Sequence, residues 1–201
     1  MIKLILIALL ALVVLVFLRG LVLLALLALL ACLAYAILRT MMIRPTAAKN
    51  AQPPAADAVR AKAYGEKLSA MVKLETVSSR FDPDRAKFRA FQDSLAPLFP
   101  RVFAACEVHH PGDGLVLHLK AENPKGEPIL LMSHHDVVEA QGEWSHAPFS
   151  GDIDETGRVW GRGTVDTKGS LMCELQALEE LLASGWKNEK DVYITSSCTE
   201  E

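Results

Sequence analysis

An almost uncharged apolar run at the start of the chain constrains the fold more than any other feature. Between Leu4 and Leu38 the only charged side chain is Arg19, and residues 21–38 are 18 uninterrupted apolar residues. A helix rises about 1.5 Å per residue, so a helix of this length roughly matches the ~30 Å hydrocarbon core of a bilayer. We therefore predict an N-terminal membrane anchor in residues 1–44, with one transmembrane helix.

The number of membrane crossings stays open at this point. The preceding apolar run, residues 4–18, has 15 residues. It fits a short second span, a signal-like region, or a continuation of one tilted helix past Arg19 and Gly20. A cleaved secretory signal is disfavoured, because the apolar region is about twice the usual length and no small-x-small site ends it. Basic residues flank the long run on both sides and do not fix its orientation. We favour an uncleaved anchor, with the rest of the chain on the lumenal or extracytoplasmic side.

Beyond the anchor, composition divides the chain into a linker and a domain. Residues 45–56 are rich in Ala and Pro and poor in large apolar side chains, which is typical of a tether that buries no core. Residues 57–201 are expected to form the folded domain. The first 44 residues hold four of the 21 basic residues and no acid, so the remainder has 17 basic against 24 acidic residues, a formal charge of −7. A nucleic-acid partner is therefore not expected.

The spacing of apolar residues in the domain predicts both helices and strands. Two amphipathic helices are expected first, over residues 57–74 and from about Pro83 onward, and a third over residues 166–183. Strand-like runs cover residues 102–108, 115–119, 129–132 and 192–196. This order predicts an α/β domain with a mixed sheet flanked by helices.

The first chemically informative segment is Ser133-His134-His135-Asp136, directly after the apolar run 129–132. The carboxyl end of a strand in an open α/β sheet is where ligands usually bind. A histidine there can bind zinc through one ring nitrogen, while a carboxylate two residues later accepts the hydrogen bond of the other nitrogen. His134 is then the candidate ligand and Asp136 the residue that orients it. Alone, a His-x-Asp pattern is more often an ordinary polar strand end.

A glycine-rich segment, residues 161–169, carries the second candidate. It reads Gly-Arg-Gly-Thr-Val-Asp-Thr-Lys-Gly, and its Asp166 lies just before the predicted helix. A carboxylate in that position either caps the helix or bridges two metal ions.

Two adjacent carboxylates, Glu200 and Glu201, follow the last strand-like run. They would repel each other unless a metal ion or a proton separates them. One can hold a cation while the other handles protons. In isolation, such a pair is most often simply solvated.

Together, the three segments resemble the aminoacylase, carboxypeptidase S and glutamate carboxypeptidase family of dinuclear zinc hydrolases, zinc metallopeptidase family 20. The resemblance runs from about Ala61 to Glu201. It rests on Ser-His-x-Asp-Val-Val, Gly-Arg-Gly-x-x-Asp-x-Lys-Gly and a strand leading into Glu-Glu, in the family's order. It implies the N-terminal half of a zinc-exopeptidase-type catalytic domain, preceded here by a transmembrane helix.

The resemblance also implies a role for each site residue. His134 would bind one zinc ion, Asp166 would bridge two, and Glu201 would bind the second. Glu200 would be the general base, and Asp136 would orient His134. The implied mechanism is metal-assisted hydrolysis of an amide bond, in which Glu200 takes a proton from water and returns it to the leaving amine.

A membrane segment followed by a proline-containing tether is most similar to the carboxypeptidase S and secreted N-acyl-amino-acid hydrolase branch. This implies small peptides with a free carboxylate, or N-acyl amino acids, as substrates, and the lipid bilayer as a further partner. Two zinc ions are expected per complete site, although mixed nitrogen and oxygen ligands also accept Co²⁺ or Mn²⁺. His135 falls in the variable position of its motif and is treated as a non-ligand.

Members of this family carry two more ligands after the Glu-Glu pair, and a small lid domain that mediates dimerisation in many of them. The chain ends at Glu201, so it is expected to be an N-terminal fragment, inactive alone, of an enzyme that dimerises through its lid. One alternative is a non-catalytic, membrane-tethered binding or interaction module. Another keeps the enzyme but makes an acetylated or succinylated biosynthetic amino acid its substrate.

Overall fold

The structure, a computed structural model, describes residues 1–42, 57–79 and 84–201. The chain divides into two units, Met1–Pro54 and Ala55–Glu201. Among the described residues, the first unit contains one helix, and the second contains the sheet and the other helices. The predicted linker, residues 45–56, lies outside the described residues.

Helix α1 spans Ile2–Met42 and continues without a break through Arg19 and Gly20. Its 41 residues correspond to a length of about 60 Å, roughly twice the hydrocarbon thickness of a bilayer. The part Ile5–Met42 is apolar and long enough to cross a membrane. The expected apolar N-terminal helix is therefore present as one continuous element.

A mixed four-stranded sheet organises the second unit. In spatial order the strands are β1 (Glu107–His109), β2 (Leu115–Leu119), β4 (Val192–Ser197) and β3 (Ile129–His134). The first three pair antiparallel, and β3 pairs parallel to β4. The predicted α/β class with a mixed sheet is confirmed. Because β3 and β4 run in the same direction, their carboxyl ends meet at one edge of the sheet.

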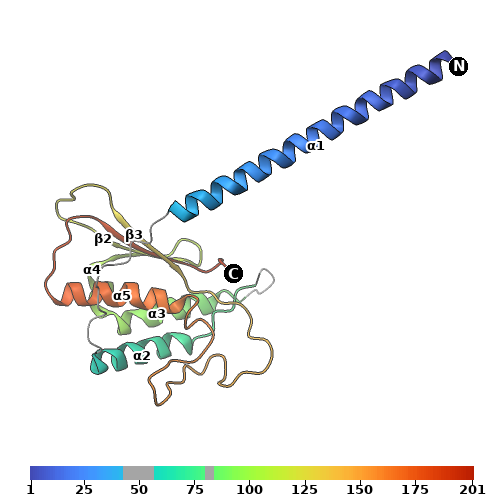
Figure 1. Cartoon of the computed structure of the whole chain (residues 1–201). Coiled ribbons are helices and arrows are strands. Elements are labelled where there is room, and N and C mark those ends of the chain that lie inside the picture. Colours follow the sequence, from blue (N-terminus) through green and yellow to red (C-terminus); the bar gives the residue numbers. More distant parts are fainter. Residues whose placement is uncertain (43–56, 80–83) are drawn as a thin grey trace. The chain divides into compact units, whose positions relative to one another are not determined.

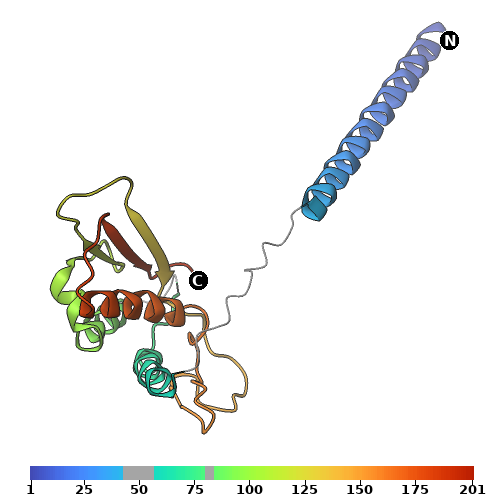
Figure 2. The same ribbon diagram turned by 60° about the vertical axis from the view of Figure 1, so that its left-hand side comes forward.

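Helices cover one face of this sheet (Figures 1 and 2). They are α2 (Ala58–Val72), α3 (Ala86–Leu98), α4 (Pro100–Ala105) and α5 (Lys168–Ala183). Burial alternates over residues 130–133 of β3, as the sheet pleat requires. Leu131 packs against the core, whereas Leu130 and Met132 are 55% and 70% exposed on the other face. Deeply buried core side chains include Phe91, Leu95, Leu117, Leu171, Leu175 and Ile194.

One sequence expectation is wrong: the run 102–108 is not a single strand. Its first half belongs to α4, and only Glu107–His109 is strand. Pro100 suits the first turn of a helix because that position needs no amide donor. The carboxylate of Glu179 on α5 accepts hydrogen bonds from the backbone amides of Arg101 and Val102, with a distance of 3.0 Å to each nitrogen. A cap supplied by a distant helix therefore overrides the local strand propensity.

Candidate metal centre

His134 is the last residue of β3 and lies opposite Ser197 of β4. Its side chain is 10% exposed. The Nδ1 atom faces Asp136, with 3.0 Å to the backbone oxygen and 3.4 Å to the carboxylate atom Oδ1. The Nε2 atom faces the other way, toward a group of carboxylates. Asp136 therefore holds Nδ1 of the ring in place, and Nε2 remains available to bind a metal ion.

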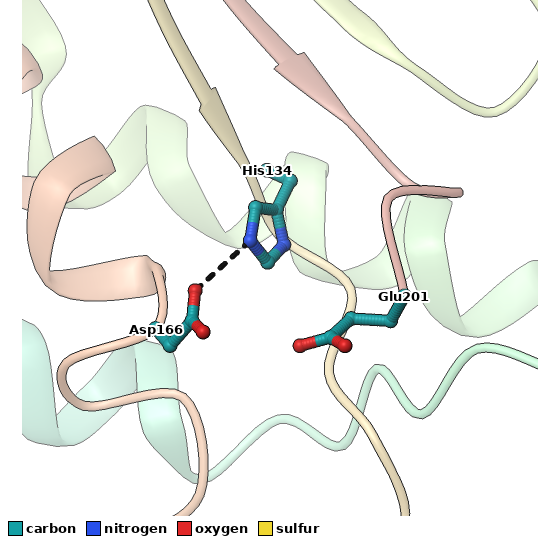
Figure 3. A group of neighbouring side chains, drawn as sticks. All are labelled: His134, Asp166 and Glu201. Atoms are coloured by element: carbon teal, nitrogen blue, oxygen red, sulfur yellow. Dashed lines mark hydrogen bonds and ion pairs between the residues drawn. The ribbon is translucent and has the colours of Figure 1, made fainter. Parts of the chain in front are cut away.

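Asp166 reaches this nitrogen from the glycine-rich segment that precedes α5 (Figure 3). Its Oδ1 atom lies 3.1 Å from Nε2 of His134, and its side chain is 77% exposed. The segment is shaped by Gly163, which has a φ of +87°, a conformation that side chains other than glycine rarely adopt. The predicted segment thus delivers its carboxylate to the end of β3.

The two terminal glutamates come to the same place from the end of β4. The Oε2 atom of Glu200 lies 3.5 Å from Nε2 of His134. The backbone amides of Glu200 and Glu201 both donate to Oδ2 of Asp136, over 3.0 and 3.1 Å. Asp136 is fully buried, so its carboxylate links the ends of β3 and β4. The carboxylate of Glu201 points toward the His134 and Asp166 side chains (Figure 3).

The donor set fits a divalent cation. Donor atoms of His134, Asp166 and Glu201 lie within 4.8 Å of one another, so small rotations of the two exposed carboxylates would bring all three within reach of one ion. The buried Oδ1 atom of Asp136 has no hydrogen-bond partner among the described residues. A metal ion on Nε2 of His134 requires the ring hydrogen to be on Nδ1, where this oxygen can receive it. Such a nitrogen-and-oxygen set suits zinc and other first-row divalent ions.

The structure therefore brings all five predicted site residues to one edge of the sheet, and their individual roles stay predictions. The sequence indicated no supporting role at the site for two buried neighbours. Lys168, in the same glycine-rich motif, donates through Nζ to the backbone oxygens of Met71 and Leu74, over 3.2 and 2.6 Å. These oxygens lie at the end of α2, where a cation is favourable. Burial lowers the pKa of Lys168 to about 7.

His135 is the second buried neighbour. Its side chain is fully buried and contacts Phe91, Gln92 and Ser196. That His135 is no ligand stays a prediction. Its position in the motif gave no indication of these contacts, because Gln92 lies 43 residues away in the chain.

Comparison with known sequences gives consistent matches. Residues 130–201 match the family described as Peptidase family M20/M25/M40. The chain is 35% identical over 143 residues to probable carboxypeptidase S-like 2 of Dictyostelium discoideum, covering 68% of this chain and 27% of that protein. It is also 35% identical over 149 residues to carboxypeptidase S of Saccharomyces cerevisiae, covering 68% and 26%. A third match, N-fatty-acyl-amino acid synthase/hydrolase PM20D1 of Bos taurus, is 35% identical and covers 69% and 28%.

Comparison with solved structures gives the same fold. Human carnosine dipeptidase 1 superimposes with a TM-score of 0.60 at 18% identity, covering 71% of this chain and 33% of that one. An M20 family metallo-carboxypeptidase of Sulfolobus solfataricus gives 0.54 at 21% identity, covering 67% and 30%. The chain spans about a quarter of the length of the curated relatives named above.

Proposed function

Because this chain belongs to peptidase family M20/M25/M40, we propose that it forms the first part of the active site of a zinc-dependent hydrolase of amide bonds. The observation that carries this proposal is the arrangement around His134. Its Nε2 atom faces the carboxylates of Asp166 and Glu200, while Nδ1 is held by the buried Asp136.

Each of the five residues has a proposed role in this reaction. His134, Asp166 and Glu201 would hold zinc, with Asp166 bridging two ions in a complete site. Zinc, when bound, supplies a Lewis acid that polarises the amide and lowers the pKa of water. Asp136 keeps the ring hydrogen of His134 on Nδ1, so that Nε2 presents its lone pair.

Glu200 is the proposed general base. Its Oε2 atom lies on the open side of the His134 ring, 3.5 Å from Nε2, and its side chain is 60% exposed. A carboxylate there can take a proton from a water molecule and return it to the leaving amine. Its backbone amide is fixed by Asp136, which restricts where the side chain can reach.

We assign small peptides with a free carboxylate, or N-acyl amino acids, as the substrate class. The names of the relatives support this choice, since they include a carboxypeptidase S and an N-fatty-acyl-amino acid synthase/hydrolase. The length and apolar character of α1 support a membrane-tethered protein.

Zinc binding tests the proposal directly. The chain Met1–Glu201, solubilised in detergent, is titrated with zinc against a chromophoric chelator. Binding should weaken strongly in His134→Ala and in Asp166→Ala, because each removes a ligand. It should be unchanged in His146→Ala, which removes a loop histidine that contacts Asp152. Equal zinc affinity in all of these proteins would overturn the assignment.

Turnover separates the enzyme from a binding module. In the protein isolated from its native source, Glu200→Gln should lose hydrolysis of an N-acyl amino acid while keeping its zinc. Zinc bound without any hydrolysis of peptides or N-acyl amino acids by the unmodified protein would instead favour the tethered binding module.

A further inference from the structure

The buried ring of His135 sits directly behind the candidate metal centre. It stacks on Phe91, with ring centroids 5.2 Å apart and planes 9° from parallel. Phe88 meets it edge-on at 5.8 Å. All three rings are fully buried. A histidine enclosed in this way needs a partner for each ring nitrogen, because an unpaired buried polar atom is costly.

Both partners are present, and they fix which nitrogen carries the hydrogen. The Nε2 atom of Gln92 donates to the backbone oxygen of Asp113 over 2.6 Å. A backbone oxygen only accepts, so the amide of Gln92 is oriented with its NH₂ group on this side. The same NH₂ group lies 3.3 Å from Nε2 of His135. That ring nitrogen must therefore accept, and it carries no hydrogen.

The other half of the network follows from this orientation. The hydrogen of the His135 ring is on Nδ1, which donates to Oγ of Ser196 over 2.9 Å. The Oε1 atom of Gln92 accepts from Nδ1 of His110 over 2.7 Å. Protonation of His135 would turn two donors toward each other at Gln92.

The backbone around this ring carries the site residues. His134 and Asp136 are its two chain neighbours. The amide of His135 donates to the oxygen of Ser197 over 2.9 Å, which extends the pairing of β3 with β4 by one residue. Its carbonyl oxygen accepts from the hydroxyl of Thr76. The ring bond to Ser196 adds a side-chain link to the same strand, β4.

We propose that His135 is a positioning residue for the metal centre: a neutral imidazole, held between Gln92 and Ser196, that sets the direction of the His134 ring and of the Asp136 carboxylate. This inference rests on the proposed function, since it assigns His134 as a metal ligand. It gives a specific role to a position that the motif leaves variable.

The test compares two His→Phe substitutions. His135→Phe keeps the stacking on Phe91 but leaves Gln92 and Ser196 unpaired at the ring. His118→Phe is the matched control. His118 also stacks on an aromatic ring, Tyr193, at 4.1 Å, and hydrogen-bonds to Asp191, which directly precedes β4. Zinc affinity is measured by chelator competition on the full chain, and the absorption bands of bound Co²⁺ report the coordination geometry.

Zinc affinity should fall about tenfold in His135→Phe, as for the loss of other residues that support a ligand. The Co²⁺ bands should shift in His135→Phe and not in His118→Phe. Unchanged affinity and unchanged bands in folded His135→Phe would overturn the positioning role. If the unsubstituted chain binds no zinc, the proposed function fails instead.

A second measurement covers the case in which His135→Phe does not fold. Long-range ¹H–¹⁵N spectra of the unsubstituted chain, labelled at histidine, show which ring nitrogen carries the hydrogen. A neutral His135 with hydrogen on Nδ1 is expected at pH 7. Hydrogen on Nε2, or on both nitrogens, would contradict the inference.

Discussion

The Oδ2 atom of Asp136 accepts a hydrogen bond of 3.0 Å from the backbone amide of Glu200, 64 residues further along the chain. Asp136 therefore has two tasks at once. One carboxylate oxygen fixes the segment that follows β4, and the other faces Nδ1 of His134 at 3.4 Å. Both tasks require an acceptor on each oxygen, which a carboxylate supplies and an amide does not.

Asp136→Asn should weaken zinc binding about 10- to 100-fold. The amide has only one oxygen, so its NH₂ group must face either the backbone amides of Glu200 and Glu201 or Nδ1 of His134. Either way two donors face each other, because the backbone oxygen of Asp136 keeps the ring hydrogen on Nδ1. Chelator competition measures the loss. Asp152→Asn is the control, because Asp152 also contacts a histidine, His146 at 3.0 Å, but on the surface. Equal affinities in the two variants would contradict this role.

Lys168 should make stability depend on pH. Its pKa is about 7 in the folded chain and near 10.4 when unfolded. Between these values the unfolded chain binds a proton that the folded chain does not, so the free energy of unfolding should rise with pH. The slope is at most about 1.4 kcal/mol per pH unit.

Lys168→Met isolates this effect, because it keeps the length of the side chain and removes the titrating group. Urea unfolding of the metal-free chain at pH 7, 8 and 9 should show the unsubstituted protein gaining stability relative to Lys168→Met. If the free energies of unfolding of the two proteins change equally with pH, Lys168 keeps an ordinary pKa.

The residues of the candidate site could be predicted from the sequence. The residues that hold them in place could not. His134, Asp136 and Asp166 stand in short motifs at strand and helix ends, and the resemblance of the three segments taken together predicted that they share one site. Gln92 lies in an ordinary amphipathic helix, and no local pattern connects it with His135. Similarly, residues with strand propensity after Pro100 become helical through a contact with a helix almost 80 residues away.

Gly163→Ala should cost more stability than Gly142→Ala, although both glycines have a positive φ, +87° and +80°. A methyl group at Gly163 would lie 2.9 Å from Cγ1 of Val137 and 3.3 Å from Cδ of Lys168, whereas the space around Gly142 is open. Backbone strain of about 1–2 kcal/mol is common to both, and overpacking adds about 1–3 kcal/mol at Gly163. Urea midpoints measure the difference. Equal losses of stability in the two variants would show that the atoms around Gly163 move aside without an energetic cost.

Glu179→Ala should destabilise the domain by about 1–3 kcal/mol, because it leaves the amides of Arg101 and Val102 without their acceptor. The side chain of Glu179 is only 8% exposed, so water cannot easily replace it. Glu189→Ala is the matched control. It breaks an ion pair of 2.8 Å with Lys125, but both side chains are about 70% exposed, and such pairs contribute about 0–1 kcal/mol.

Hydrogen exchange locates the effect of Glu179→Ala. Amides of α4 should lose protection first, since this short helix, Pro100–Ala105, has no side-chain cap of its own at its N-cap residue. If both Glu→Ala variants unfold at the same urea concentration and α4 keeps its protection, the cap from α5 does not hold the helix, and local propensity must explain why residues 102–105 are not a strand.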